Sequence, residues 1–264
     1  MVQNKPVKKT QLRKQQVKSA PKRTVSKQKG KKKTQKEMPA WCRYLLGMLI
    51  VAVFVSGFYW FFIRPYAYRW KPCYGLKGYG VCMPHGYQIH GIDISHYQGD
   101  VKWKMLEQTR QGQFPVKFIF MKATEGGDYA DNKFVANFDS ARAHGFIRGA
   151  YHFYNPKTDA NKQADFFINS VKLEPGDLPP VLDIEKKSRD VKKLQDDLKI
   201  WLRKVENHYG VKPIIYASYK FKTKYLNDSV FDSYPYWIAH YYVDSVRYQG
   251  EWKFWQHTDV GTLP

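Results

Sequence analysis

The feature that most constrains this chain is a run of 20 consecutive residues without a formal charge, Tyr44–Ile63. At 1.5 Å per residue, a helix of this length crosses the roughly 30 Å hydrocarbon core of a membrane. No polar face interrupts the run, and Trp41, Tyr59 and Trp60 stand near its ends, where interfacial aromatic side chains occur. We predict one transmembrane helix over residues 41–64. A cleavable signal peptide and a buried helix of a soluble protein are the alternatives.

Positive charge is concentrated ahead of this run. The first 40 residues hold 14 lysines and arginines and one acid, Glu37, in a chain of formal net charge +21. Residues 1–40 contain few apolar side chains, so we predict a disordered cytoplasmic tail. The positive-inside rule then places the C-terminal part outside a bacterial inner membrane. Binding of lipid or nucleic acid by the tail, as a membrane scaffold, is an alternative, but topology already explains the charge and we expect no nucleic-acid partner.

A Gly/Tyr-rich connector, residues 65–87, follows the predicted helix. Cys73 and Cys82 flank its sequence CYGLKGYGVC, while Cys42 lies apart from them. The pair can form a disulfide in an oxidising compartment or remain as two free thiols. A second Cys/His pair at zinc-ligand spacing is absent from the sequence, and we expect neither a metal nor a cofactor.

Residues 88–264 alternate short β-branched or apolar runs with longer amphipathic stretches, a pattern typical of a β/α architecture. The clearest helix covers 189–209, where apolar residues recur at three- and four-residue spacing. Ser188 is a candidate N-cap and Gly210 a candidate C-cap for it. Two further helices are predicted over 132–144 and 159–171. The predicted strands are 89–95, 116–123, 147–154, 178–185, 212–218, 234–241 and 252–257.

Three acids stand at the ends of predicted strands: Asp93 in GIDIS, and Asp183 and Glu185 in VLDIE. Functional groups gather at the carboxyl ends of parallel strands. Residues i and i+2 of a strand share a face, so Asp183 and Glu185 can converge on one substrate atom. Their repulsion would keep one protonated and the other ionised, as glycosidic cleavage requires. An acid pair on a solvated edge or in a salt bridge is the alternative.

The motifs GIDISHYQGDVKW, FIFMKATEGGDYADNKF, FDSARAHGFIRGAYHFY, LPPVLDIE, PIIYASY, YWIAHY and WKFWQH occur in this order. Together they resemble glycoside hydrolase family 25, the lysozymes of the Chalaropsis and Cellosyl type. The resemblance covers roughly 88–264. It implies an irregular TIM-like β/α barrel with late antiparallel strands, and hydrolysis of the β-1,4 bond between N-acetylmuramic acid and N-acetylglucosamine in peptidoglycan by a monomer.

The resemblance also implies roles for individual residues. Glu185 matches the general acid/base, Asp183 the acid that assists through the substrate's 2-acetamido group or the developing charge, and Asp93 the acid on the groove floor. It favours retention of configuration, although inversion stays open because no carboxylate separation is known. Aromatic and amide side chains at other strand ends are expected to bind sugar. These are Tyr151, Phe153, Tyr216, Trp237 and Gln256, with Trp255 as a weaker candidate and the core as the alternative for each aromatic.

The resemblance fails at one point. Family members carry an acid in a closing segment after the WQ strand, whereas Asp259 follows WKFWQH too soon to match it. We therefore keep a second hypothesis beside the lysozyme, a catalytically weak or inactive membrane-anchored glycan-binding module.

Overall fold

The computed structural model describes residues 38–64 and 73–263. The predicted disordered tail lies almost entirely outside the described residues, as does the first part of the connector. The chain divides between Tyr59 and Trp60 into two compact units, and each is described by itself.

The first unit contains the helix α1 (Ala40–Phe58), which continues through the π-helical turn η1 (Tyr59–Ile63). No side chain of α1 is buried. In the described part of the chain, Ala40–Ile63 is the one helix that is long and apolar enough to cross a membrane. The structure thus gives the predicted transmembrane segment a helical conformation.

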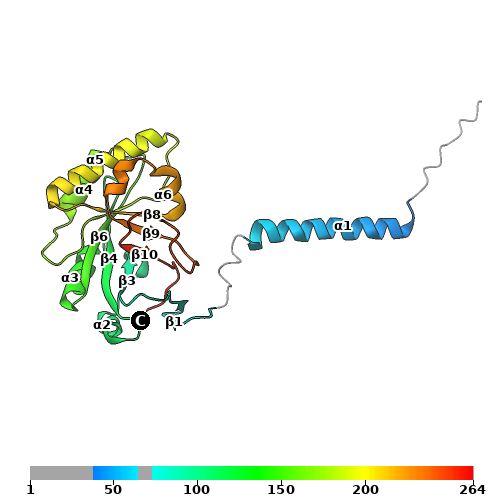
Figure 1. Ribbon diagram of the computed structural model, residues 1–264, viewed down its shortest axis with the longest axis horizontal. Coiled ribbons are helices and arrows are strands. Elements are labelled where there is room, and N and C mark those ends of the chain that lie inside the picture. Colours follow the sequence, from blue (N-terminus) through cyan, green and yellow to red (C-terminus); the bar gives the residue numbers. More distant parts are fainter. Residues whose placement is uncertain (1–37, 65–72, 264) are drawn as a thin grey trace, which may run out of the picture. The chain divides into compact units, whose positions relative to one another are not determined.

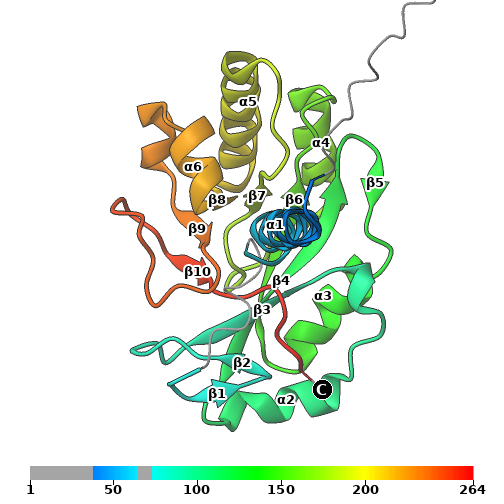
Figure 2. The same ribbon diagram turned by 90° about the vertical axis from the view of Figure 1, so that its right-hand side faces the viewer.

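The second unit is built on a curled sheet that forms a half-barrel, with helices on its outer side (Figures 1 and 2). The strands pair in the order β10-β9-β8-β7-β6-β4-β3, and all of these neighbours are parallel. The strands are β3 (His90–Ile94), β4 (Val116–Glu125), β6 (Ile147–Phe153), β7 (Val181–Asp183), β8 (Ile214–Ser218), β9 (Tyr236–Ala239) and β10 (Phe254–Gln256). A short strand, β5 (Tyr129–Ala130), pairs antiparallel with β4.

Alternation along the strands separates two apolar layers, because successive side chains of a strand point to opposite faces. Ile119 and Met121 of β4 belong to the large core, whereas Phe120 between them joins Val181 and Trp237 in a smaller cluster. The large core also takes side chains from the helices. The helices are α2 (Trp103–Gln108), α3 (Phe134–Ala143), α4 (Ala160–Ser170), α5 (Val191–Tyr209) and α6 (Tyr219–Tyr225), with the 3-10 turns η3 (His96–Gln98), η4 (Thr109–Gln111) and η5 (Ser229–Ser233).

The prediction of late antiparallel strands was wrong, since β8, β9 and β10 all run parallel. Parallel neighbours need a crossover of about a dozen residues or more, and both late connections are long enough. The first holds α6 and η5, and the second is residues 240–253, which form neither helix nor strand. Because residues 240–253 have no helical periodicity, the sequence pattern did not predict this crossover.

The predicted caps of α5 were half right. Gly210 ends α5 in the left-handed conformation, with φ 68°. The N-cap is Asp190, whose Oδ1 accepts a hydrogen bond from the Lys193 amide at 2.9 Å. Ser188 accepts instead from the amide of Asp190, at 3.3 Å. The correct start lies two residues after the predicted cap because aspartate competes for the same role.

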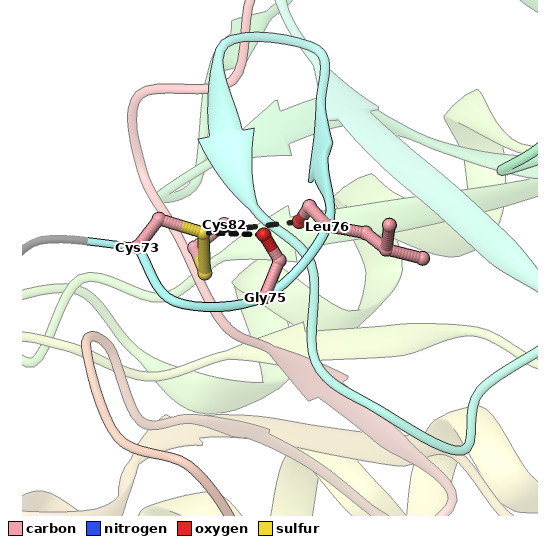
Figure 3. Close-up of a disulfide and its surroundings, with 4 residues drawn as sticks. All are labelled: Cys73, Gly75, Leu76 and Cys82. Carbon is pink, nitrogen blue, oxygen red and sulfur yellow. Dashed lines mark hydrogen bonds between the residues drawn. A yellow bond between two sulfur atoms is a disulfide. The ribbon is translucent and has the colours of Figure 1, made fainter.

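The connector ends in a small hairpin of β1 (Lys77–Gly78) and β2 (Val81–Cys82). A disulfide joins Cys73 to Cys82, which decides between the two alternatives that the sequence left open (Figure 3). The C-terminal residues return to this hairpin, where the Thr262 amide donates to the Tyr79 carbonyl oxygen at 2.8 Å. The hairpin and the end of the chain therefore form one corner of the second unit (Figure 2).

Candidate active site

All eight side chains proposed for the site line one open pocket with a volume of about 190 Å³. They come from β3, β6, β7, β8, β9 and β10 and from the segment just after β7, at or close to the carboxyl ends of β3, β6, β7 and β10. The lining consists of the predicted Asp93, Tyr151, Phe153, Asp183, Glu185, Tyr216, Trp237 and Gln256, together with Ser95, Tyr97 and Lys122. Their convergence follows from the parallel register, which puts these strand ends at one edge of the sheet.

The two acids of VLDIE reach the pocket in a slightly different way from the one predicted. β7 ends at Asp183, so Glu185 lies in the segment that follows the strand. The amide of Ile184 still donates to the Tyr216 carbonyl oxygen at 3.0 Å, which keeps this segment along β8. Asp183 and Glu185 consequently line the same pocket although only one of them belongs to the strand.

Asp183 is buried, with 8% of its surface exposed, and Oδ1 has no hydrogen-bond partner among the described residues. Burial raises its pKa well above the usual value, and the charges of Glu185 and Asp93 raise it further. Burial also raises the pKa of Glu185, and the neighbouring Tyr216 hydroxyl opposes this. Glu185 is more exposed than Asp183. The pair thus combines a buried inner acid, whose raised pKa favours its protonated form, with an outer acid that is accessible from the pocket.

Asp93 is open to the pocket yet surrounded by protein atoms. This burial raises its pKa, while a hydrogen bond from Gln256 lowers it. Gln256 Nε2 donates to Asp93 Oδ2 at 2.7 Å. Because β3 and β10 are the two edges of the sheet, this bond links opposite ends of the half-barrel at the pocket. Gln256 was expected to bind sugar, and the structure engages its amide with Asp93.

Aromatic rings form much of the pocket wall. Trp237 stacks on Phe120 with ring centroids 4.6 Å apart and meets Tyr216 edge-on at 4.6 Å. Phe153 is approached by two ammonium groups, with Lys122 Nζ 4.8 Å and Lys186 Nζ 4.5 Å from its ring centroid. Both lysines interact with Glu125, so a three-residue ion cluster covers Phe153. Within this cluster, Lys122 Nζ and Glu125 Oε2 are 2.6 Å apart.

Other sequence candidates lie outside the pocket. Trp255 donates from Nε1 to the His240 carbonyl oxygen at 2.8 Å and contacts Tyr87, with ring centroids 5.6 Å apart. Asp259 accepts a hydrogen bond from the Tyr242 hydroxyl at 2.8 Å. Among the described residues, Asp93, Asp183 and Glu185 are the acids of the pocket lining.

The sequence reasoning missed Ser95, Tyr97 and Tyr241. Ser95 is the last residue of the predicted strand 89–95 that carries Asp93, and Tyr97 follows that strand by two residues, so their position in the chain was a usable signal. Tyr241 is the last residue of the predicted strand 234–241, but that position does not reveal its role, a hydrogen bond from its hydroxyl to Gln256 Oε1 at 2.6 Å.

Comparisons with known proteins agree with this geometry. The model of the family described as glycosyl hydrolases family 25 matches residues 92–264. The chain belongs to glycosyl hydrolase family 25. It is a glycoside hydrolase, and the enzyme class expected from the motifs is confirmed.

Individual relatives extend this family-level result. The chain is 38% identical over 204 residues to the uncharacterized protein YegX of Escherichia coli K12, covering 76% of this chain and 73% of that protein. It is 30% identical over 192 residues to Lysozyme M1 of Streptomyces globisporus, covering 66% and 63%. A solved family 25 glycosyl hydrolase from Bacillus anthracis superimposes with a TM-score of 0.62 at 33% identity, covering 68% of this chain and 83% of that one. Activity on peptidoglycan is thereby supported at the level of the family.

Proposed function

We propose that this chain cleaves the β-1,4 bond between N-acetylmuramic acid and N-acetylglucosamine in peptidoglycan. The observation that carries the proposal is the cluster of three carboxyl groups, each with a raised pKa, in one aromatic-walled pocket. Glycosidases need one protonated and one ionised carboxyl group near the scissile bond. Membership of family 25 supplies the substrate class.

Glu185 is the proposed general acid. Its carboxyl proton passes to the glycosidic oxygen as the bond from that oxygen to the anomeric carbon breaks, and positive charge develops on the sugar. Water then attacks the anomeric centre, and the Glu185 carboxylate takes up a proton from it. A raised pKa suits this role because it keeps the acid protonated closer to neutral pH.

Asp183 and Asp93 act on the charge that develops. Asp183, protonated and with a buried unpaired oxygen, is suited to a hydrogen bond with the substrate's 2-acetamido group. Asp93, which accepts from Gln256, supplies negative charge on the pocket floor. The faces of Trp237, Tyr216 and Tyr151 offer apolar surface to pyranose rings. Residues 88–264 form the proposed catalytic domain.

The experiment uses full-length protein in detergent micelles and purified peptidoglycan. Wild type should release muramic-acid reducing ends, and Glu185→Gln should lose about 10² to 10⁴ of this rate, the range expected for a general acid. Glu251→Gln is the matched control, because Glu251 is an exposed acid paired with Lys253. Folded wild type that binds glycan without releasing ends would favour the glycan-binding module instead.

We also propose that the helix Ala40–Ile63 anchors the enzyme in a bacterial inner membrane, with its N-terminus in the cytoplasm and the pocket outside. Its length and composition support this, together with the basic residues before it and the disulfide after it. Carbonate extraction should leave the chain in the membrane fraction. Alkaline phosphatase, which is active only after export, should be active when fused after residue 263 and inactive when fused after residue 36.

A further inference from the structure

Three hydrogen bonds fix the direction in which the Gln256 amide faces. Its Oε1 accepts from the hydroxyls of Tyr216, at 2.7 Å, and Tyr241, at 2.6 Å, while Nε2 donates to Asp93 Oδ2 at 2.7 Å. An ionised carboxylate can only accept. A rotated amide would place its oxygen against Asp93, an arrangement that is satisfied only if Asp93 carries a proton.

Tyr241 is the member of this network that stands outside the pocket. It follows β9 by two residues and is not part of the pocket lining, whereas Tyr216 and Gln256 are. Its hydroxyl also lies 3.3 Å from that of Tyr216. Tyr241 therefore does not line the pocket itself, and its effect on the substrate passes through the Gln256 amide and Asp93, or through Tyr216.

We propose that Tyr241 is a positioning residue whose hydroxyl holds the Gln256 amide so that it donates to Asp93 and keeps Asp93 ionised beside the substrate. This proposal rests on the proposed glycosidase function of the pocket. It gives a role to Tyr241, the last residue of the motif YWIAHY, to which the sequence assigned none.

The surroundings of Asp93 make this donor important. The groups that face it from other elements are Tyr151 on β6, Asp183 and Glu185 at the end of β7, Tyr241 after β9 and Lys122 on β4. Two of them are acids that disfavour a charge on Asp93, and burial does the same. The Gln256 amide is the group that lowers the pKa of Asp93 through a hydrogen bond from its side chain.

The test compares Tyr241→Phe with Tyr242→Phe in full-length protein in detergent micelles. Tyr242 is the matched control because its hydroxyl donates to Asp259, at 2.8 Å. The Asp93 carboxyl is titrated by ¹³C NMR, with Asp93→Asn to assign its signal, and kcat/KM on peptidoglycan is measured against pH. Tyr241→Phe should raise the Asp93 midpoint and the acidic limb of kcat/KM together by about one pH unit. Tyr242→Phe should move neither.

A uniform loss of activity in Tyr241→Phe with an unmoved Asp93 midpoint would reduce Tyr241 to a structural role and overturn the proposal. If Tyr241→Phe does not fold, Gln256→Met, which removes the amide, takes its place. This variant must raise the midpoint of the Asp93 titration by at least as much, and an unchanged midpoint would also overturn the proposal. The carboxyl titration needs no turnover. An inactive wild type would therefore count against the proposed function, while the titration of Asp93 would still show whether Tyr241 affects its midpoint.

Discussion

Two neighbouring residues of β6 lead into two different polar environments. Tyr151 faces the pocket with Asp183, and His152 faces the helices on the other side of the sheet. Both His152 and Asp183 are buried. The histidine has every hydrogen bond satisfied, whereas the carboxyl group has a buried oxygen without a partner among the described residues.

The environment of His152 is a closed network. Gln163 Nε2 donates to the carbonyl oxygens of Asn155 and Thr158, at 3.0 and 2.9 Å, so Oε1 faces His152 and accepts from its Nε2 at 3.2 Å. The other ring nitrogen then accepts from the Thr124 hydroxyl at 2.7 Å. This network attaches the segment after β6 to α4. Both ring nitrogens of His152 and both polar atoms of the Gln163 amide are engaged in it, so none of them is available to bind a ligand.

The comparison of His152 with Asp183 distinguishes buried polar groups that stabilise the fold from buried polar groups that are available for catalysis. A buried polar atom without a partner costs about 1 to 3 kcal/mol, so a fold tolerates it where another function requires it. Asp183 carries this cost at the pocket, and His152 avoids it 31 positions earlier in the chain.

The largest expected effect is on catalysis. Asp183→Asn should reduce kcat by about 10² to 10³, the range for losing one preorganised hydrogen-bonding group that acts in the transition state. Its stability should not fall. Because burial raises the pKa of Asp183, wild type loses stability as rising pH ionises this carboxyl, and the variant should be the more stable one at alkaline pH. Thermal unfolding and steady-state kinetics at pH 6 and 9 measure both. Asp165→Asn, at an exposed acid, is the control.

The opposite result is expected on the other face of the sheet. Gln163→Met leaves the His152 Nε2 proton and the Asn155 amide without an acceptor, which should cost about 2 to 4 kcal/mol of unfolding free energy. The kcat of the folded fraction should stay within about twofold of wild type, since Gln163 does not reach the pocket. Urea unfolding and active-fraction kinetics are the measurements. A large loss of kcat without a loss of stability would contradict the assignment of Gln163 to the fold and not to catalysis.

Acid should destabilise the protein through the His152 network. Burial lowers the pKa of His152 to about 4, below the usual 6.5. Between these values the unfolded chain binds the proton more readily, so stability is lost as pH falls below about 6.5. From pH 7 to pH 5 the loss from His152 should be about 2 kcal/mol. Urea unfolding at both values measures it, and a His152→Phe variant should show a smaller difference between them.

The sequence was sufficient to predict the site residues whose positions depend on the pattern within a single strand. Asp93, Asp183 and Tyr216 stand at ends of apolar runs, and period-two alternation with parallel topology brings such ends together. It also placed Gly210 at the end of α5. Family motifs added the enzyme class, which alternation alone could not give.

What the sequence could not give depends on contacts between distant segments. Gln256 and Asp93 are 163 positions apart, and their bond exists only because the half-barrel brings its two edge strands together. The parallel direction of β10 was hidden for a related reason, since the crossover over 240–253 has no helix to mark it. The disordered tail over residues 1–40 remains a prediction from charge and composition.

The smallest predicted effect concerns one hydroxyl. Thr124→Val keeps the side-chain shape but removes the donor to His152 Nδ1, a bond of 2.7 Å. Leaving this buried nitrogen without a partner should cost about 1 to 2 kcal/mol of unfolding free energy, with kcat unchanged. Thr223→Val is the control, because the Thr223 hydroxyl donates to the Tyr219 carbonyl oxygen at an exposed position, and its loss should cost less than about 0.5 kcal/mol. Equal costs for the two variants would mean that burial does not set the value of the Thr124 bond. The His152 network would then be no more structural than any surface contact.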